Sequence, residues 1–201
     1  MAAAIEADVR SILPPIREGK IDRAYTNAWN DWWKSQDRPR LSRWDRTRAN
    51  NIFEYLTTHL MDEFADDSGA RFIFGRETFK LIFDNQLVAR FKKTGSDGMG
   101  SNIGTQAEID WGDAQTDLPG FSRIQKVEID YVVNVTGTAI AKIIVLARNG
   151  KNKMWDYEIA SSQGGAEVLT RPQPTPPLTP IDSLVKERKT GKPKKSAKGK
   201  E

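Results

Sequence analysis

Five charged residues in the second half of the chain have the composition of a metal-dependent nuclease site. Carboxylates stand at Glu128, Asp130, Asp156 and Glu158, and Lys142 lies between the two pairs in sequence. Such a nuclease needs two or three acids, usually with a lysine, at one metal ion. In both pairs the acids alternate with apolar residues, which is also typical of the solvent-facing side of a half-buried sheet. We favour the second interpretation and expect no catalytic residue, metal or cofactor.

A second candidate is an anion-binding surface around the glycine-rich stretch 95–104. The Walker pattern, Gly-Lys-Ser/Thr at the start of a helix, is absent, so the stretch has no nucleotide signature. An ordinary loop between strands is the favoured interpretation. The alternative hypothesis is that flanking polar side chains converge on an anion, and these are Arg90, Lys92, Lys93, Asn102, Thr105 and Gln106.

Basic residues are interleaved with tryptophans between positions 32 and 48. Residues 34–48 hold six Lys/Arg against two Asp, next to tryptophans at 32, 33 and 44. Arginine beside an exposed aromatic ring suits a sugar-phosphate backbone with stacked bases. The alternative, which we favour, places the tryptophans in the core and pairs the arginines with nearby acids. The candidate patch is Trp33, Arg40, Arg43 and Arg46, and Trp33 lies off the apolar stripe of its helix.

The strongest charge asymmetry lies at the carboxyl terminus. Residues 171–201 hold nine Lys/Arg and three Asp/Glu, so they carry +6. The whole chain carries +4, so residues 1–170 carry −2. Such a tail is either a sequence-independent phosphate-binding arm or a solubilising tail without a partner. Its candidate contacts are Lys189, Lys192, Lys194, Lys195 and Lys198.

The amino-acid composition excludes sites that depend on cysteine and leaves little room for sites that depend on histidine. The chain has no cysteine and one histidine, His59. A zinc site would need carboxylates for almost all of its ligands, which is uncommon. Disulfides and cysteine nucleophiles are excluded as well. We expect His59 to be a partnered polar residue at the edge of a helix face.

Apolar periodicity predicts two helices in the first third of the chain. The first carries a stripe with spacings of three and four, namely Ile21, Ala24, Tyr25, Ala28, Trp29 and Trp32. The second begins near Ser42-Arg43-Trp44-Asp45, which has the form of a capping box. Its expected apolar face is Ile52, Phe53, Leu56, Leu60, Met61 and Phe64.

From Arg71 onward the apolar period approaches two, which is typical of strands. Phe79, Leu81 and Phe83 form one row, and residues 84–86 are expected to turn into a strand over 87–93. A second row, from Val127 to Val133, leads through a turn at 137–138 into residues 139–147. Asn149-Gly150 predicts a type I′ hairpin, and its return strand covers 153–160.

Helices followed by hairpins predict an α+β fold with N-terminal helices packed on an antiparallel β-sheet built of hairpins. The expected domain covers residues 1–170, with helices in about 1–68 and the sheet in about 71–160. Residues 171–201 are expected to be a Pro-rich linker and a Lys-rich disordered tail, since five of residues 171–180 are proline. No apolar run reaches the ~18 residues of a membrane span, so we expect a cytoplasmic protein without membrane contact.

Four segments carry a resemblance to a known family. They are Leu-Val-Ala-Arg-Phe-Lys-Lys at 87–93, Ser-Asn-Ile-Gly-Thr-Gln at 101–106, Leu-Pro-Gly at 118–120 and Met-Trp-Asp-Tyr-Glu-Ile at 154–159. Through these segments, the part of the chain from residue 48 to residue 160 resembles a family of bacterial mobile-element proteins of uncharacterised activity. Members of that family are encoded beside a helix-turn-helix regulator and an ImmA/IrrE-type metallopeptidase. The chain departs from that pattern at Thr94-Gly95 and Asp130-Tyr131. The resemblance implies a regulatory, toxin–antitoxin or phage-defence setting.

We therefore expect a non-catalytic binding protein of a bacterial mobile-element or phage-defence locus, contacting nucleic acid through its basic tail. Two alternatives stay open. One is an antitoxin or inhibitor that binds a protein partner encoded nearby, and the other is the metal-dependent nuclease. The oligomeric state is not predicted by the sequence.

Overall fold

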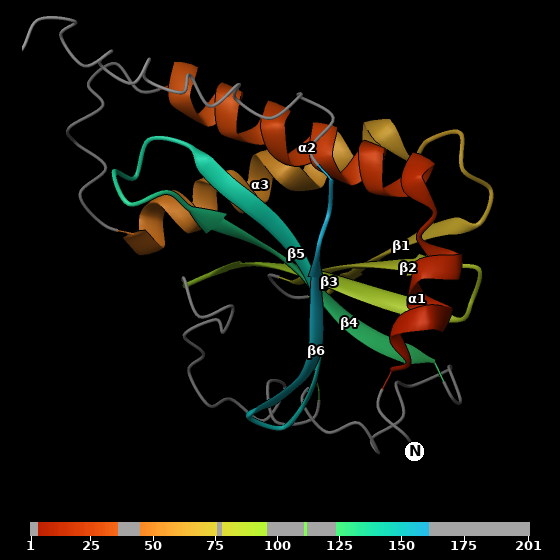
Figure 1. Cartoon of the computed structure of the whole chain (residues 1–201). Helices are drawn as coiled ribbons and strands as arrows, with labels where there is room; N and C mark the ends of the chain where they lie inside the picture. Colours follow the sequence, from red (N-terminus) through yellow and green to blue (C-terminus); the bar gives the residue numbers. More distant parts are fainter. Residues whose placement is uncertain (1–3, 36–44, 76–77, 96–110, 112–123, 161–201) are drawn as a thin grey trace, which may run out of the picture. The chain divides into compact units, whose positions relative to one another are not determined.

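Helices precede strands along the chain in the computed structural model, which describes residues 4–35, 45–75, 78–95, 111 and 124–160 (Figure 1). The described helices are α1 (Glu6–Ile12), α2 (Pro15–Lys34) and α3 (Asp45–Glu63). The strands are β1 (Ala70–Gly75), β2 (Thr78–Phe83), β3 (Leu87–Thr94), β4 (Gln125–Val133), β5 (Ile140–Asn149) and β6 (Asn152–Glu158). This arrangement confirms the predicted α+β class.

The chain separates into two compact units, residues 1–165 and 166–201. The second unit lies outside the described residues, and so do the predicted linker and the basic tail with its five candidate lysine contacts. None of the helices in the described part of the chain combines the length and apolarity needed to cross a bilayer.

The sheet is six-stranded, and its spatial order follows the chain order from β1 to β6. Neighbouring strands are antiparallel except β3 and β4, which pair in parallel from Leu87 opposite Gln125 to Thr94 opposite Val132. The expectation of a purely antiparallel sheet is therefore wrong at this pair. A parallel pair needs a crossover of a dozen or more residues, and residues 95–124 between β3 and β4 are long enough to supply it.

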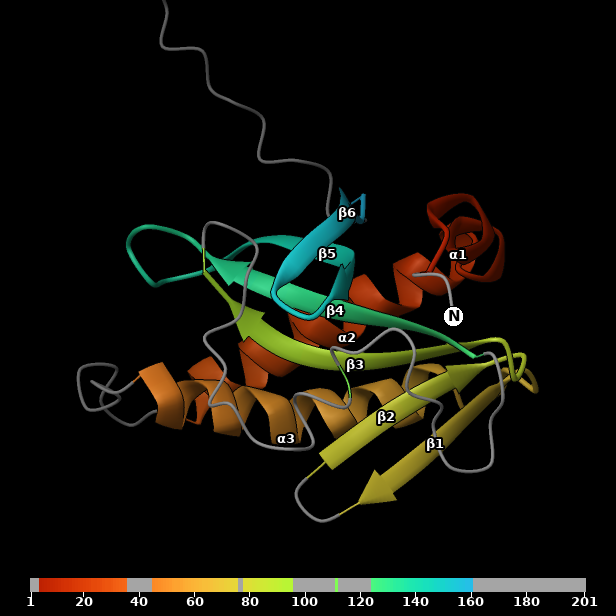
Figure 2. The ribbon, with the colours of Figure 1, turned by 90° about the horizontal axis from the view of Figure 1, so that it is seen from below.

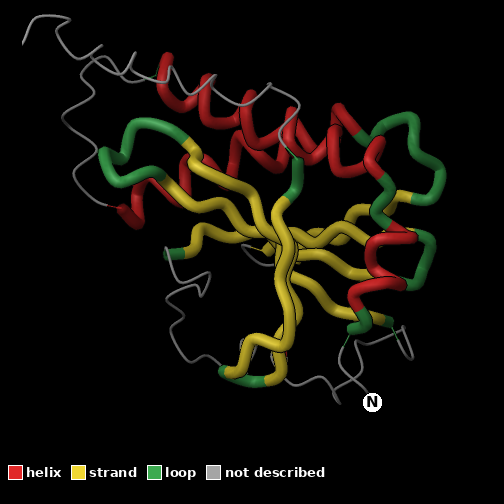
Figure 3. The backbone as a smooth tube through the Cα atoms, in the orientation of Figure 1, coloured by secondary structure: helices red, strands yellow, loops and turns green. Residues whose placement is uncertain are grey.

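The helices α2 and α3 lie side by side on one face of the sheet, as the tube drawing shows (Figure 3). Every residue of the predicted α2 stripe is buried, from Ile21 to Trp32. On α3, Ile52, Leu56 and Leu60 are buried as predicted, but Met61 is 42% exposed. Met61 follows Leu60 directly, and one residue of helix turns the side chain about 100° away from the stripe.

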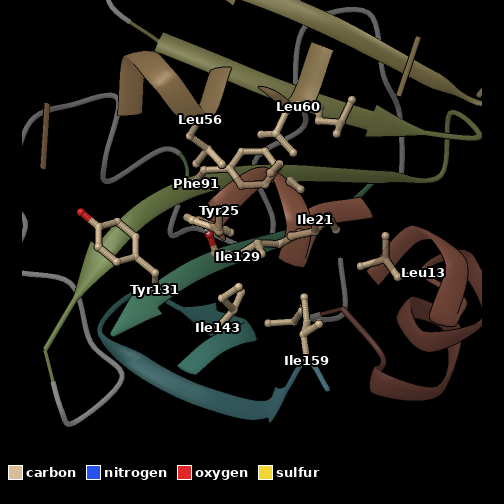
Figure 4. Packing of buried hydrophobic residues seen from close by; sticks show 14 of the residues in the cluster. Leu13, Ile21, Tyr25, Leu56, Leu60, Phe91, Ile129, Tyr131, Ile143 and Ile159 are labelled. Atoms are coloured by element: carbon tan, nitrogen blue, oxygen red, sulfur yellow. Dashed lines mark hydrogen bonds between the residues drawn. The ribbon is translucent and has the colours of Figure 1, made fainter. Parts of the chain in front are cut away.

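The core between helices and sheet is built from alternate strand residues (Figure 4). Phe91, Ile129 and Ile143 point toward α2 and α3, and Tyr25 of α2 is fully buried among them. The Tyr25 hydroxyl donates a hydrogen bond of 2.5 Å to the backbone carbonyl of Ile129. The predicted period of two in these strands is thus confirmed.

Two tight turns show how local sequence sets the hairpins. Asp84 and Asn85 have φ of 51° and 56°, the two positive values that a type I′ turn requires between β2 and β3. At the β5–β6 hairpin, Asn149 pairs with Asn152, so the loop is Gly150-Lys151. Only Gly150 has positive φ there, which is the pattern of a type II′ turn. The hairpin prediction is confirmed and the predicted turn type is wrong.

The guanidinium of Arg17 joins three segments at one end of the sheet. It forms a bidentate pair with Asp67, with Nε–Oδ2 at 2.8 Å and Nη2–Oδ1 at 2.9 Å. Its Nη1 also binds Asp84 Oδ2 at 2.6 Å and the carbonyl of Ile12 at 2.8 Å. Gly69 lies against this network, and a Cβ there would be 2.1 Å from Asp84 Oδ1. The start of α2 is thereby fixed to the turns before β1 and after β2.

The amino-terminal segment is held by the last strands of the described fold. The indole Nε1 of Trp155 donates to the carbonyl of Ala4 at 2.6 Å. The amide of Ile5 donates to Gln125 Oε1 at 3.0 Å, and the guanidinium of Arg10 lies 3.6 Å from the centre of the Tyr157 ring. Residues near position 5 are thus part of the folded body.

Candidate functional site

The sheet face opposite α2 and α3 carries a cluster of buried charges centred on Glu128 of β4. Arg90 of β3 donates from Nε to Glu128 Oε1 at 2.7 Å, and its Nη2 contacts the same oxygen. Arg148 of β5 donates to that oxygen from Nε at 2.9 Å and pairs with it through Nη2 at 2.8 Å. All three side chains are largely buried. The arrangement neutralises Glu128 with two cations.

Asp130 lies two residues further along the same strand and on the same face. Its side chain is fully buried, and neither carboxylate oxygen has a hydrogen-bond partner in the described part of the chain. Burial, and secondarily the charge of Glu128, raise the pKa of Asp130 to about 8, while Lys92, Arg90 and Arg148 oppose the rise. The carboxyl group is therefore mainly protonated at neutral pH.

Trp111, from the segment between β3 and β4, packs on this face. It is buried in a small cluster with Ile82, Val88 and Ile124. The Arg90 guanidinium lies 4.7 Å from its ring centre and the Lys80 ammonium lies 5.2 Å from it, within the range of cation–π contacts. Burial, and secondarily the charge of Arg90, lower the pKa of Lys80.

These contacts correct the expectation that the strand carboxylates lie on a solvated sheet surface. Glu128 and Asp130 do point away from the helices, but both are buried, while Asp156 and Glu158 on β6 are exposed. In the register, Leu146 of β5 lies between Glu128 and Asp156. Within the described ranges, no three Asp, Glu, His or Cys side chains are grouped so that they could hold a metal ion. The four acids therefore do not meet at one point.

The predicted anion-binding residues are divided between the two faces of β3. Arg90 and Lys92 lie on the face with Glu128 and Asp130. Lys93 faces the helices, where its Nζ lies 3.1 Å from Asp45 Oδ2 at the start of α3. This ammonium, together with Arg48, holds the pKa of Asp45 below its usual value. Asn102, Thr105 and Gln106 lie outside the described residues.

Two residues of the predicted basic and aromatic patch lie in the described part of the chain, Trp33 in the last turn of α2 and Arg46 in the first turn of α3. Trp33 is 41% exposed, as its place off the stripe predicts, whereas Trp29 and Trp32 are buried. Its ring lies edge-on to that of Trp32, with centres 5.8 Å apart. Arg46 is exposed on the first turn of α3. Arg40 and Arg43 lie outside the described residues.

His59 has the role expected for an edge histidine. Its Nε2 lies 2.9 Å from Asp31 Oδ2, so α3 and α2 are joined by this polar contact. Two residues of the buried charge cluster, Arg148 and Trp111, were not among the sequence candidates. The alternation of Ile144, Leu146 and Arg148 could have placed Arg148 beside Glu128, but no local signal pairs Trp111 with Arg90.

Comparison with protein-family models, curated proteins and solved structures finds no match to this chain. Any function must therefore be argued from the residues and geometry described above.

Proposed function

We propose that this chain is a non-catalytic binding protein that contacts nucleic acid at the joined ends of α2 and α3, with the basic tail adding sequence-independent affinity. The contact surface is Trp33, Lys34 and Arg46, hereafter the helical end. The observation that carries the proposal is the exposure of Trp33, while Trp29 and Trp32 on the same helix are buried. Exposed cations follow it at Lys34 and, on the first turn of α3, at Arg46.

Trp33 has the properties of a stacking platform. Its indole is supported edge-on by the buried ring of Trp32, which in turn packs against Trp29 with ring centres 5.1 Å apart. A supported ring loses little freedom when a base stacks on it. Stacking of a base on an aromatic side chain contributes ~1–3 kcal/mol and tolerates any base sequence.

The charge distribution directs a polyanion to the same place. Residues 31–48 carry six Lys/Arg and three Asp, a net of +3, and residues 171–201 carry +6. Residues 1–170 together carry a net charge of −2, so residues 1–30 and 49–170, which exclude the positive stretch 31–48, carry −5. A negative strand is therefore attracted to the helical end and the tail and repelled by the rest.

The other sequence candidates are less suited to this role. Arg90 and Arg148 are buried against Glu128, and Lys93 pairs with Asp45. The neutralisation of Glu128 by two arginines also speaks against the nuclease, because a metal ion would have to displace both. The phage-defence or regulatory setting is part of the proposal as what the resemblance of residues 48–160 implies.

The stacking contact is tested by fluorescence anisotropy with labelled single-stranded DNA and RNA of about 20 nucleotides, longer than a typical single-strand site. Trp33→Ala is expected to weaken binding roughly 5- to 100-fold, as removal of one stacked base predicts, and Trp33→Phe to keep most of it. Ile16→Ala, at the exposed other end of α2, is the matched control. Equal affinities for all four proteins would refute the helical end as the contact.

The tail is tested separately in the full chain by replacing five of its seven lysines with glutamine, namely Lys189, Lys192, Lys194, Lys195 and Lys198. The salt dependence of log K is expected to flatten by ~0.7 for each phosphate of a single strand that the tail no longer neutralises. Trp33→Ala should leave that slope unchanged. Binding that neither variant alters would refute both proposed contacts. Absence of nucleic-acid binding by the wild-type chain would instead favour the antitoxin-like alternative, and magnesium-dependent cleavage abolished in Asp130→Asn would favour the nuclease.

A further inference from the structure

The two edges of the sheet differ in their protection against pairing with another strand. The β6 edge carries Lys153, Asp156 and Glu158, and its register with β5 shifts at Ala147/Arg148. Charges and bulges of this kind discourage further pairing. β1 carries one charge, Arg71, followed by Phe-Ile-Phe-Gly, and it pairs with β2 in unbroken register. The β1 edge therefore lacks these protective features.

Alternate residues of β1 direct their backbone hydrogen-bonding groups away from β2. The amide of Asp84 donates to the carbonyl of Gly69 at 2.8 Å, which makes these two residues a hydrogen-bonded pair of the β1–β2 ladder. Such pairs recur at every second residue, so Arg71, Ile73 and Gly75 bond toward β2. Phe72 and Phe74 direct their N–H and C=O groups outward, where β1 has no neighbouring strand in the described sheet (Figure 2).

An aromatic row on the helix-facing side leads to this edge. Phe91 and Phe79 have ring centres 5.7 Å apart, and Phe79 lies 5.7 Å from Phe72 and 5.6 Å from Phe74. Phe79 and Phe91 are buried, but Phe74 is 59% exposed. The row thus ends in a large apolar side chain at the edge of the described sheet.

We propose that β1 pairs with β1 of a second copy of this chain, giving a two-fold symmetric dimer with one continuous sheet. The outward groups of Phe72 and Phe74 set the register, in which Phe72 lies opposite Phe74 of the second copy. Ile73 then lies at the two-fold axis, opposite its own equivalent. Both Phe72–Phe74 pairs fall on the helix-facing side, where aromatic cross-strand pairs are favourable, and each extends the row into the second copy.

Repulsion between the two Arg71 side chains favours this antiparallel arrangement over a parallel one. Arg71 lies opposite Gly75 of the second copy, so the two arginines are four residues apart along the strand, roughly 13 Å. That separation exceeds the screening length of ~8 Å at physiological salt. A parallel pair in register would bring the arginines to about 5 Å. The strand is thus complementary to itself in hydrogen bonding and apolar surface, and the antiparallel register keeps its like charges apart, which is why a second copy is the inferred partner.

The register is tested by crosslinking of the full chain. Non-hydrogen-bonded antiparallel pairs have Cα atoms about 4.5 Å apart, within the range that a disulfide spans. Because the chain has no cysteine, Ile73→Cys gives one thiol per copy and is expected to form a covalent dimer under mild oxidation. Met154→Cys, exposed on the β6 edge, is the matched control and should crosslink at least tenfold more slowly.

Association itself is measured by sedimentation of the full chain up to about 100 μM, because so small an interface predicts a weak dimer. Phe74→Lys is expected to raise the dimer dissociation constant at least tenfold, and Met154→Lys to leave it unchanged. A wild-type chain that stays monomeric, or Ile73→Cys that crosslinks no faster than Met154→Cys, would overturn the proposal. These variants leave Trp33 and Arg46 intact, so the outcome is independent of the proposed nucleic-acid contact.

Discussion

The hydroxyl of Tyr25 and the backbone carbonyl of Ile129 are joined by a 2.5 Å hydrogen bond that links the middle of α2 to the middle of β4. Both residues are fully buried, so this polar contact lies inside the core between the helices and the sheet. A buried hydroxyl left without a partner costs ~1–3 kcal/mol. The bond therefore favours one position of α2 along the sheet over the neighbouring positions.

Tyr25→Phe removes the donor and leaves the carbonyl of Ile129 short of one partner. We expect the free energy of unfolding in urea to fall by about 1–2 kcal/mol. Tyr55→Phe on α3 is the control, since Tyr55 is partly exposed and a surface change of this kind stays within ~0.5 kcal/mol. Equal effects at the two tyrosines would show that the bond contributes nothing specific.

Glu128→Gln leaves Arg90 and Arg148 facing a neutral group in a buried site. Removing one partner of a buried ion pair costs about 3–5 kcal/mol, and we expect a decrease of that order in urea unfolding. Glu6→Gln is the matched substitution, because Glu6 pairs with Arg10 at the surface and such pairs contribute ~0.5 kcal/mol or less. A decrease below ~1 kcal/mol at Glu128 would contradict the described cluster.

The raised pKa of Asp130 predicts that the fold becomes less stable as the pH rises from about 4 to about 8. Its pKa is raised by burial to about 8 in the folded state, against ~3.9 in the unfolded chain. Between these values the folded state holds the extra proton, so stability falls as pH rises. We expect a decrease of about 3 kcal/mol between pH 5 and roughly pH 7.5. Asp130→Asn should flatten this dependence, measured by urea unfolding across pH, and an unchanged slope would refute the assignment.

Two glycine-to-alanine substitutions are expected to have opposite signs. At Gly69 the added methyl would lie 2.1 Å from Asp84 Oδ1 and 2.5 Å from Arg17 Nη2, so the Arg17 network must open, at a cost of about 1–2 kcal/mol. At Gly19, within α2, the nearest atom is 3.6 Å away. There alanine is expected to stabilise the helix by ~0.5–1 kcal/mol. Thermal unfolding of both variants gives the comparison, and a Gly69 variant as stable as the wild type would contradict the network's role.

The fold is largely predictable because its signals are local. The apolar spacing of α2 and the alternation in β2 and β4 assign each side chain to a face without knowledge of the rest of the chain. The same reasoning identifies Trp33 as exposed. The period of two also separates Lys93 from Arg90 and Lys92, although the three are close in sequence and are easily grouped for that reason.

The charge cluster is less predictable because it depends on contacts between distant segments. Alternation places Glu128 and Asp130 on the face away from the helices but does not say what covers that face. Their burial depends on Arg90, Arg148 and a parallel β3–β4 pairing, and residues 95–124 give no local signal for that pairing. The type II′ turn at Gly150 escapes prediction for a smaller reason, since the pairing of Asn149 with Asn152 shifts the loop by one residue.

The bond between Trp155 and Ala4 joins residues that are 151 positions apart in the chain. During synthesis at ~5–20 residues per second, the segment around Ala4 therefore waits roughly 8–30 s before its partner leaves the ribosome. Gln125, the partner of Ile5, also emerges late. Residues 4–12 thus lack their β6 partner until that strand has been translated, and a bulky group fused before Ala4 would act on β6, which is 151 residues away in the chain.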